Sequence, residues 1–237
     1  MSASLAERVG AVPWSSVVET LEQQGVALIP GLLSVQECRD LVAIYGQSQR
    51  FRSKVVMQRH GYGRGEYQYF DYPLPELVAG LREQVYPALV PLANRWHEAL
   101  GFEARFPNAL HDFVERCHAA GQARPTPLML RYEAGDYNCL HQDLYGEHVF
   151  PLQLAILLSK PGDDFEGGEL VLTEQRPRMQ SRPMVLTPSQ GDAVVFAVRH
   201  RPVQGSRGFR RVQMRHGVSR IERGQRHTLG IIFHDAT

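Results

Sequence analysis

The chain has 237 residues, of which 43% are hydrophobic and 22% charged, as is typical of a globular protein. This length fits one core, so we expect a single domain over residues 1–237. No apolar run approaches the ~18 residues of a membrane span, and no secretory signal begins the chain, so we expect a soluble, cytoplasmic protein.

The first 125 residues are expected to form mainly helical support and a lid. Ser34 and Glu37 have the spacing of a capping box, in which each side chain bonds the other's backbone N–H at the start of a helix. Further helices are expected from residue 75 to about 100, broken at Pro87 and Pro91 because proline lacks the N–H that a helix needs. The remaining predicted elements of this half are a helix over 15–25, a strand over 26–30, a helix over 35–45 and a helix from about 107 to 120.

A basic-aromatic segment over residues 51–72 interrupts this helical half. It holds six aromatic residues, three glycines and four basic residues. Such a composition predicts an ordered but irregular surface loop, and a loop of this kind could cover a site.

After residue 125 the sequence changes to short β-rich runs separated by turn residues. Eight runs at this density predict a β-sandwich or barrel over residues 126–237, with the helical half as its buttress. The runs are 128–134, 137–144, 149–159, 167–173, 184–188, 192–198, 210–221 and 226–235.

Charge is uneven along the chain, although the net charge is only +1. Residues 176–226 contain twelve arginines and only two acids, Asp192 and Glu222. The planar donor fork of arginine suits phosphate and carboxylate partners, so this segment is a candidate nucleic-acid surface; a solvated arginine-rich face is the alternative.

The run that contains His141 and Asp143 offers metal-ligand chemistry. These side chains are two residues apart in a predicted strand, so they point to the same face. One imidazole and one carboxylate, with a second histidine from a distant strand, would form the two-His-one-carboxylate set that holds Fe(II) and leaves positions open. The H-x-D triplet alone does not identify that histidine.

The surroundings of this triplet resemble a known superfamily. Tyr132 and Gly135 precede His141, FEGGEL and PSQGDAVVF follow, and HGVSRIERGQR places Arg226 ten positions after His216. This order is similar to the core of the prolyl-4-hydroxylase-like 2-oxoglutarate/Fe(II)-dependent dioxygenases. More narrowly, LMLRYEAGDYNCLHQDLYGEHVFPLQLAILLS resembles a bacterial family described as presumed nucleic-acid oxygenases.

The resemblance implies a double-stranded β-helix, also called a jelly-roll or cupin-like core, within an α+β chain. It assigns His141, Asp143 and His216 to Fe(II) and Arg226 to the far carboxylate of 2-oxoglutarate. Tyr132 is a weaker cofactor-binding candidate. Thr228 lies on the same strand face as Arg226 and could add a hydroxyl contact.

His200 is the competing candidate for the third metal ligand. It also follows a predicted strand and has Arg210 ten residues later. Residues 201–210 are rich in Gly, Pro and Arg and read as a loop, whereas His216 and Arg226 lie in or beside alternating apolar runs. We therefore prefer His216.

The implied activity is hydroxylation or oxidative demethylation of a substrate. The reaction consumes O2 and 2-oxoglutarate and releases CO2 and succinate. A damaged nucleic-acid base fits the arginines of residues 176–226 and the aromatic residues of 51–72. The last strand, HTLGIIFHD, lacks the second arginine of AlkB-type dealkylases. Three alternatives therefore stay open. The His216–Arg226 spacing favours a protein or peptide hydroxylase, and the other two are a small-molecule hydroxylase and a non-catalytic iron/2-oxoglutarate sensor.

Overall fold

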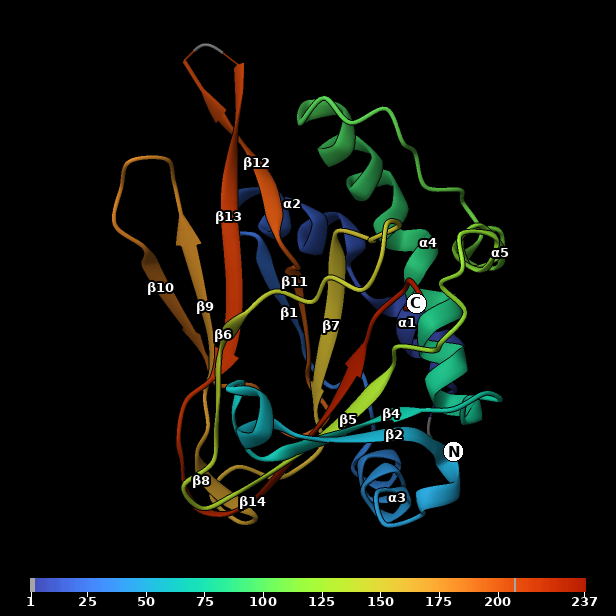
Figure 1. Ribbon diagram of the computed structural model, residues 1–237, viewed down its shortest axis with the longest axis vertical. Coiled ribbons are helices and arrows are strands. Elements are labelled where there is room, and N and C mark those ends of the chain that lie inside the picture. The colour runs from blue at the N-terminus through green and yellow to red at the C-terminus, as the bar shows by residue number, and fades with distance from the viewer. Residues whose placement is uncertain (1–2, 207) are drawn as a thin grey trace.

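The protein folds around two antiparallel sheets, shown in the computed structural model of Figure 1, which describes residues 3–206 and 208–237. The larger sheet has the order β1 (Val26–Ile29), β11 (Ala193–Ala197), β7 (Leu152–Leu157), β14 (Ile221–Ile231), β5 (Leu128–Glu133), β4 (Glu66–Phe70) and β2 (Phe51–Val56), with β8 (Phe165–Gly167) paired to β14. The smaller sheet has the order β10 (Arg182–Leu186), β9 (Leu170–Gln175), β13 (Gly208–Val218), β6 (Tyr137–His141) and β3 (Gly63–Arg64), with β12 (His200–Gly205) paired to β13. Strands distant in sequence are neighbours, which confirms the jelly-roll expectation.

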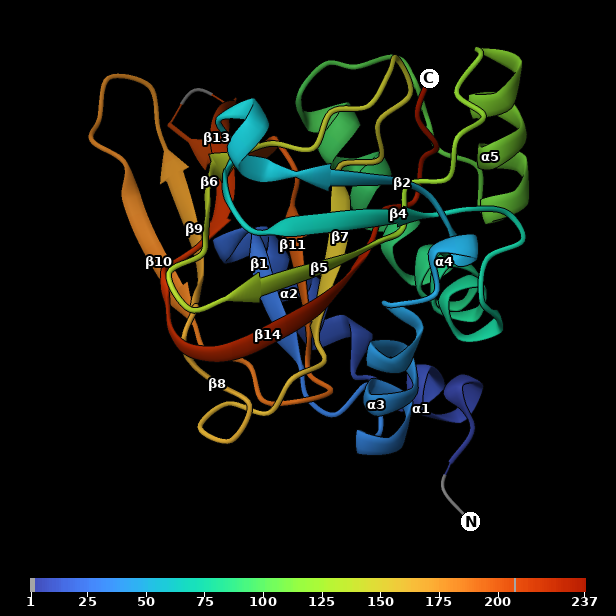
Figure 2. The same ribbon diagram turned by 60° about the horizontal axis from the view of Figure 1, so that its bottom comes forward.

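Helices pack on the larger sheet, and two of them also contact β12 of the smaller sheet (Figure 2). The α3 helix (Val35–Ile44) begins with the predicted capping box, since Ser34 accepts from the Glu37 N–H and Glu37 accepts from the Ser34 N–H. The helices are α1 (Leu5–Ala11), α2 (Trp14–Gln24), α3 (Val35–Ile44), α4 (Glu76–Ala99) and α5 (Leu110–Ala119), with short 3₁₀ helices η1 (Ser48–Arg50) and η2 (Met57–His60). In the described residues, no helix is long and apolar enough to cross a membrane.

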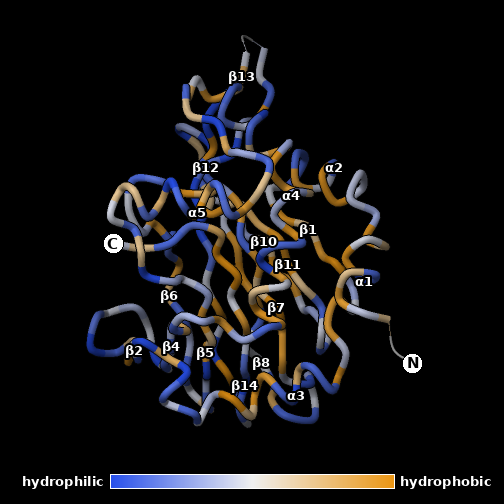
Figure 3. The backbone as a smooth tube through the Cα atoms, turned by 90° about the vertical axis from the view of Figure 1, so that its right-hand side faces the viewer, coloured by the Kyte–Doolittle hydropathy of each residue, from blue (hydrophilic) through white to orange (hydrophobic). Residues whose placement is uncertain are grey.

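The core lies between the helices and the larger sheet and continues between the sheets. All five residues of β11 are buried, because this strand is covered on both faces. In Figure 3 the central strands β7 and β11 are correspondingly hydrophobic. One core cluster includes residues from Val9 to Phe233, so the two halves of the chain share a core. The single domain over residues 1–237 stays a prediction.

The prediction that residues 51–72 form an irregular loop was wrong. The segment forms β2, η2, β3 and β4, and β4 extends the larger sheet by pairing with β5. Tyr67 and Tyr69 alternate with Gln68 and Phe70, a pattern that suits a pleated strand. The N-terminal half is therefore less helical than expected, because its four strands complete both sheets.

The predicted breaks at Pro87 and Pro91 do not occur, since α4 continues through both residues. Both prolines lie on the exposed side of the helix. The opposite side buries Leu81, Val85 and Leu89 in the core. Packing of this apolar face offsets the two missing backbone hydrogen bonds, whose carbonyls face solvent.

Candidate metal and cosubstrate site

Three metal-ligand side chains meet where β6 and β13 pair. His141 ends β6 and lies directly opposite His216 in the register of the two strands. Their ring centroids are 4.2 Å apart. Nε2 of His141 is 3.5 Å from Asp143 Oδ1, and Nε2 of His216 is 3.3 Å from Asp143 Oδ2. The three donor atoms all lie within 4.8 Å of one another, so they can hold one metal ion.

Two neighbours that sequence analysis missed hold the Asp143 carboxylate. Tyr145 donates its hydroxyl to Oδ1 at 2.8 Å, and Gln153 on β7 donates its amide to Oδ2 at 2.8 Å. The only sequence signal for Gln153 is a polar residue in the apolar run FPLQLAILLS. His141 is oriented by its own strand, since its Nδ1 is 2.8 Å from the Cys139 carbonyl.

The charges of Asp143 and His216 suit metal binding at neutral pH, whereas for His141 burial would lower the pKa but the hydrogen bond to Asp143 raises it. Burial alone would raise the pKa of Asp143, but hydrogen bonds from His141 and His216 hold it well below its ordinary value. Burial lowers the pKa of His216, and the charge of His141 lowers it further. An ionised carboxylate and a neutral imidazole are the forms that bind a metal ion.

Arg226 on β14 is a buried cation that lacks an anion. Its side chain is 3% exposed, and burial lowers its pKa to about 10, so it remains charged at neutral pH. Its Nη1 donates to Thr228 at 2.5 Å, but its buried Nε has no hydrogen-bond partner. Among the described residues no carboxylate pairs with it. A buried guanidinium in this state calls for an anionic ligand.

One cavity connects Arg226 with the metal ligands. Tyr132 lies opposite Arg226 in the strand register, with its fully buried ring 5.8 Å from the guanidinium. Gly168 allows Arg226 and Ile221 to approach the backbone closely, because a Cβ there would clash with Ile221 and lie 3.0 Å from the Arg226 side chain. The lining includes His141, Asp143, His216, Tyr132, Asn138, Gln153, Arg226 and Thr228. The cavity thus offers metal donors and a cation in one space.

His200 does not join this group. It lies on β12, opposite Gln213, and is not within the donor cluster found among residues 3–206 and 208–237. The prediction that residues 201–210 form a loop was also wrong, because β12 and β13 form a hairpin there. The preference for His216 over His200 therefore agrees with the geometry, although the loop argument for it does not hold.

The basic-aromatic segment lies against the strand that carries His141. In β3, Gly63 pairs with Asn138, and the Tyr62 carbonyl accepts the Cys139 N–H at 2.9 Å. Met57 is fully buried in a small cluster with Tyr132. The segment therefore forms one wall beside the cavity, in the position where a lid was expected; its closure stays a prediction.

Comparison with known proteins agrees with this site. Residues 65–236 match the model of a family described as an oxygenase catalysing oxidative methylation of damaged DNA. The chain belongs to this nucleic-acid oxygenase family. The family, the fold and the donor set confirm the expected enzyme class, a 2-oxoglutarate-dependent Fe(II) dioxygenase that uses Fe(II), 2-oxoglutarate and O2.

The chain has a sequence relative in Mycobacterium tuberculosis (strain ATCC 25618 / H37Rv), the uncharacterised protein Rv2227. The two are 51% identical over 167 residues, which are 70% of this chain and 72% of the relative. Among solved structures, a prolyl-4-hydroxylase of Pseudomonas putida has a TM-score of 0.53 at 16% identity and covers 94% of this chain and 99% of its own. A 2OG-Fe(II) oxygenase family oxidoreductase of Burkholderia pseudomallei has a TM-score of 0.54 at 13% identity. The match covers 96% of this chain and 94% of the oxidoreductase. At these identities the likeness shows the fold alone.

Proposed function

We propose that His141, Asp143 and His216 bind Fe(II) and that Arg226 binds the far carboxylate of 2-oxoglutarate. The single observation that carries this proposal is the buried, unpaired Arg226 in the same cavity as the donor cluster. A dicarboxylate with one end at the metal and the other at the guanidinium supplies the missing anion. Thr228 positions Arg226, and Tyr132 closes the wall behind it.

The residues around the cavity would prepare the site for oxidation of a C–H bond. Bound Fe(II) with 2-oxoglutarate and O2 supplies the oxidising power, and succinate and CO2 are released. Gln153 and Tyr145 hold the Asp143 carboxylate in one orientation. Apolar side chains of Leu128, Leu154 and Phe196 line the remaining wall and exclude water.

We further propose that the substrate is an alkylated nucleic-acid base. The family description names damaged DNA. The basic-aromatic segment adds the required chemistry beside the cavity: the half-exposed Tyr62 ring stacks on His60 at 5.3 Å, and the side chains of Arg59 and Arg64 are exposed. Aromatic rings stack bases and arginines contact phosphates in nucleic-acid sites.

A peptide hydroxylase is the second candidate. The ten-residue spacing from His216 to Arg226 favours it, and so does the absence of a second arginine in residues 227–235. A peptide would need to lie along the same wall of the cavity as the base. The two candidate functions therefore share one site and are distinguished by testing which substrate is oxidised.

Anaerobic reconstitution tests the cofactor assignment first. The purified protein is loaded with Fe(II), 2-oxoglutarate is added, and the visible charge-transfer band is compared in wild type and His216→Ala. We expect the band in wild type and its loss in the variant. His200→Ala is the matched control and should keep the band; its loss there would reverse the choice of ligand.

Substrate assays follow on the same preparation. Oxygen is admitted with N-methylated oligonucleotides or with proline-containing peptides, and succinate and formaldehyde are measured. The nucleic-acid proposal expects formaldehyde in proportion to succinate with the methylated oligonucleotide. Succinate stimulated by the peptide alone would support the peptide hydroxylase instead.

A further inference from the structure

Two long hairpins extend from the smaller sheet beyond the metal site. We call the β9–β10 hairpin and the β12–β13 hairpin the two arms. At their base β9 and β13 pair from Gln175↔Gln213 to Leu170↔Val218, and Figure 1 shows the arms separating toward their ends. They are thus two projections of one sheet.

The arms carry most of the basic excess of the arginine-rich segment. Residues 170–186 and 200–218 contain eight arginines and one acid, Glu174. That acid is buried between the arms, where it pairs with Arg201 and contacts Arg176 at 3.0 Å and Arg182 at 3.6 Å. Three arginines therefore share the one carboxylate, and the surface stays strongly positive.

Other arginines of the arms have no acidic partner. Arg178 lies in the β9–β10 turn, and Arg210 and Arg215 lie on β13; all three are exposed. Within residues 3–206 and 208–237 none of them forms an ion pair. Their guanidinium groups are free to bind an anion.

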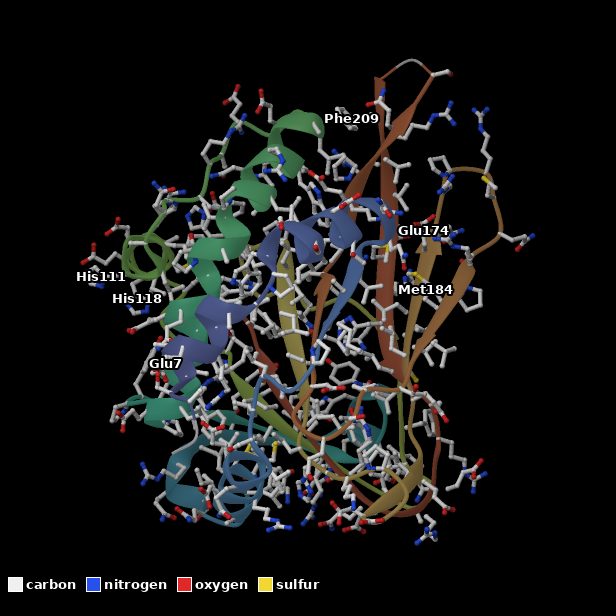
Figure 4. All side chains as sticks on the ribbon, turned by 180° about the vertical axis from the view of Figure 1, so that it is seen from behind. Glu7, His111, His118, Glu174, Met184 and Phe209 are labelled. Carbon is white, nitrogen blue, oxygen red and sulfur yellow. The ribbon has the colours of Figure 1, made fainter. Side chains whose placement is uncertain are left out.

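Apolar side chains accompany these cations. The three most exposed large hydrophobic residues of the described chain are Val185 at 62%, Met179 at 60% and Phe209 at 54%, and all lie on the arms. Figure 4 shows Phe209 near the outer end of β13, remote from the core. Exposed apolar groups beside arginines are typical of surfaces that bind a phosphate backbone and also contact bases.

We infer that the two arms bind the DNA duplex that flanks the base under repair, with the arginines on phosphates and Phe209 and Met179 against bases. This inference rests on the proposed nucleic-acid function and adds a second contact surface to it. From Arg210 to His216 the strand runs six residues, or roughly 20 Å at ~3.3 Å per residue. At ~3.4 Å per nucleotide this reach corresponds to about six nucleotides from the base at the metal.

Duplex binding tests the inference. The full-length protein is titrated into an unmodified, fluorescently labelled 20-base-pair DNA at several salt concentrations. We expect Arg178→Ala/Arg210→Ala to weaken binding about tenfold and to lower the slope of log K against log salt by about two, since each phosphate contact contributes ~0.9. The matched control is Arg39→Ala/Arg50→Ala, which removes two exposed arginines from α3 and η1 and should leave the slope unchanged.

A second variant separates stacking from charge. Phe209→Ala should weaken binding while preserving the salt slope, because it removes contact area and no cation. Three results would overturn the inference. They are an unchanged salt slope in the Arg178/Arg210 variant, an equal loss of DNA affinity in the Arg39/Arg50 control, and competition by polyglutamate that is as effective as competition by DNA.

Turnover distinguishes this inference from the proposed function. A methylated trinucleotide is too short to reach the arms, so the arm variant should process it like wild type and lose activity on a methylated 20-mer. If no methylated nucleic acid supports turnover, the proposed function fails. The role of the arms in duplex binding is tested separately, because the binding assay needs no turnover. Equal activity of the arm variant on both lengths would contradict the role of the arms.

Discussion

Asp143 shows what sequence can and cannot predict about a single residue. Strand alternation predicted His141 and Asp143 on one face of a single strand. In the structure β6 ends at His141, and Asp143 reaches the same site from the segment that follows the strand. Its partner His216 is 73 positions later and was assigned through family resemblance. Gln153 was missed because its hydrogen bond joins two different segments, and Tyr145 was missed because it lies in an irregular segment where side-chain direction has no sequence period.

Replacement of Arg226 by lysine tests the cosubstrate site. Arg226→Lys keeps a charge but removes the planar fork that can bind a carboxylate through two hydrogen bonds. We expect the Kd for 2-oxoglutarate to rise about tenfold to a hundredfold, as a charged hydrogen bond is worth ~1.5–3 kcal/mol. Titration of the charge-transfer band measures it. Fe(II) affinity should not change, and an unaltered 2-oxoglutarate affinity would remove Arg226 from the site.

Gln153→Leu tests a positioning role. The variant keeps the side-chain size but removes the amide donor to Asp143, so we expect a tenfold to hundredfold loss of metal affinity or kcat. Metal titration, kcat and the thermal midpoint should be measured together. Gln190→Leu, which removes an amide that bonds the Leu158 carbonyl, is the matched control and should lose stability without losing metal affinity. Equal metal affinity in both variants would refute the role.

At the scale of elements, the correct predictions are those with strong local signals. The capping box at Ser34 fixed the start of α3, and alternating apolar runs located the C-terminal strands. Residues 51–72 were predicted as a loop because their glycines and arginines are typical of loops. The aromatic residues Tyr67 and Tyr69, at alternate positions of β4, were the signal for a strand. The α4 helix was misjudged because local propensity was overridden by packing of its buried face.

Pro87→Ala tests that account of α4. Alanine restores the N–H that bonds the Glu83 carbonyl and removes the ring clash, without disturbing the buried face. We expect the free energy of unfolding to rise by ~1–3 kcal/mol, measured by urea denaturation. Ala88→Pro, at the neighbouring position of the same helix, should lower it. A loss of stability in Pro87→Ala would mean that the helix requires the bend that proline imposes.

His227 on β14 makes the stability of this strand depend on pH. Its ring packs edge-on against Tyr45, and burial lowers its pKa from 6.5 to about 4. The unfolded chain therefore takes up a proton below pH ~6.5, whereas the folded chain does so only near pH 4. Stability from the neutral ring is present above pH 6.5 and is lost as pH falls toward 4.

His227→Phe should make the free energy of unfolding less dependent on pH between 7 and 4.5, because phenylalanine keeps the contact with Tyr45 and cannot titrate. Urea denaturation at both pH values, compared between wild type and variant, measures the difference. His111→Phe, at an exposed position of α5, is the control and should retain the wild-type dependence. Identical pH dependence in all three proteins would contradict the assignment.

At the scale of the whole molecule, the site joins strands from across the chain. The proposed metal donors come from β6, from the segment that follows it and from β13, and the guanidinium comes from β14, while β3 from the N-terminal half pairs with β6. A ligand that bridges these strands holds both sheets together. The density of strands predicted a sandwich or barrel, and the family resemblance specified the jelly-roll. Of the N-terminal strands only β1 was predicted, whereas β2, β3 and β4 were missed.

Binding of the cofactors should therefore stabilise the fold. With Mn(II), which does not consume 2-oxoglutarate, and both ligands at a hundred times Kd, each contributes ~2.7 kcal/mol. We expect the thermal midpoint to rise by about 10 °C or more with both ligands, since ~2–4 °C corresponds to 1 kcal/mol at this size. In Arg226→Lys, the rise due to 2-oxoglutarate should shrink while that due to Mn(II) remains. No shift in wild type would contradict a shared site.

The continuity of β13 also limits how the protein can change in evolution. Side chains along a strand alternate between two faces, so insertion of one residue between Arg210 and His216 would turn the imidazole out of the barrel. An insertion in the turn between β12 and β13 leaves that alternation intact. We therefore expect relatives to differ in hairpin length at the turn, and odd-numbered insertions or deletions within β13 to be rare, because they would turn His216 out of the barrel.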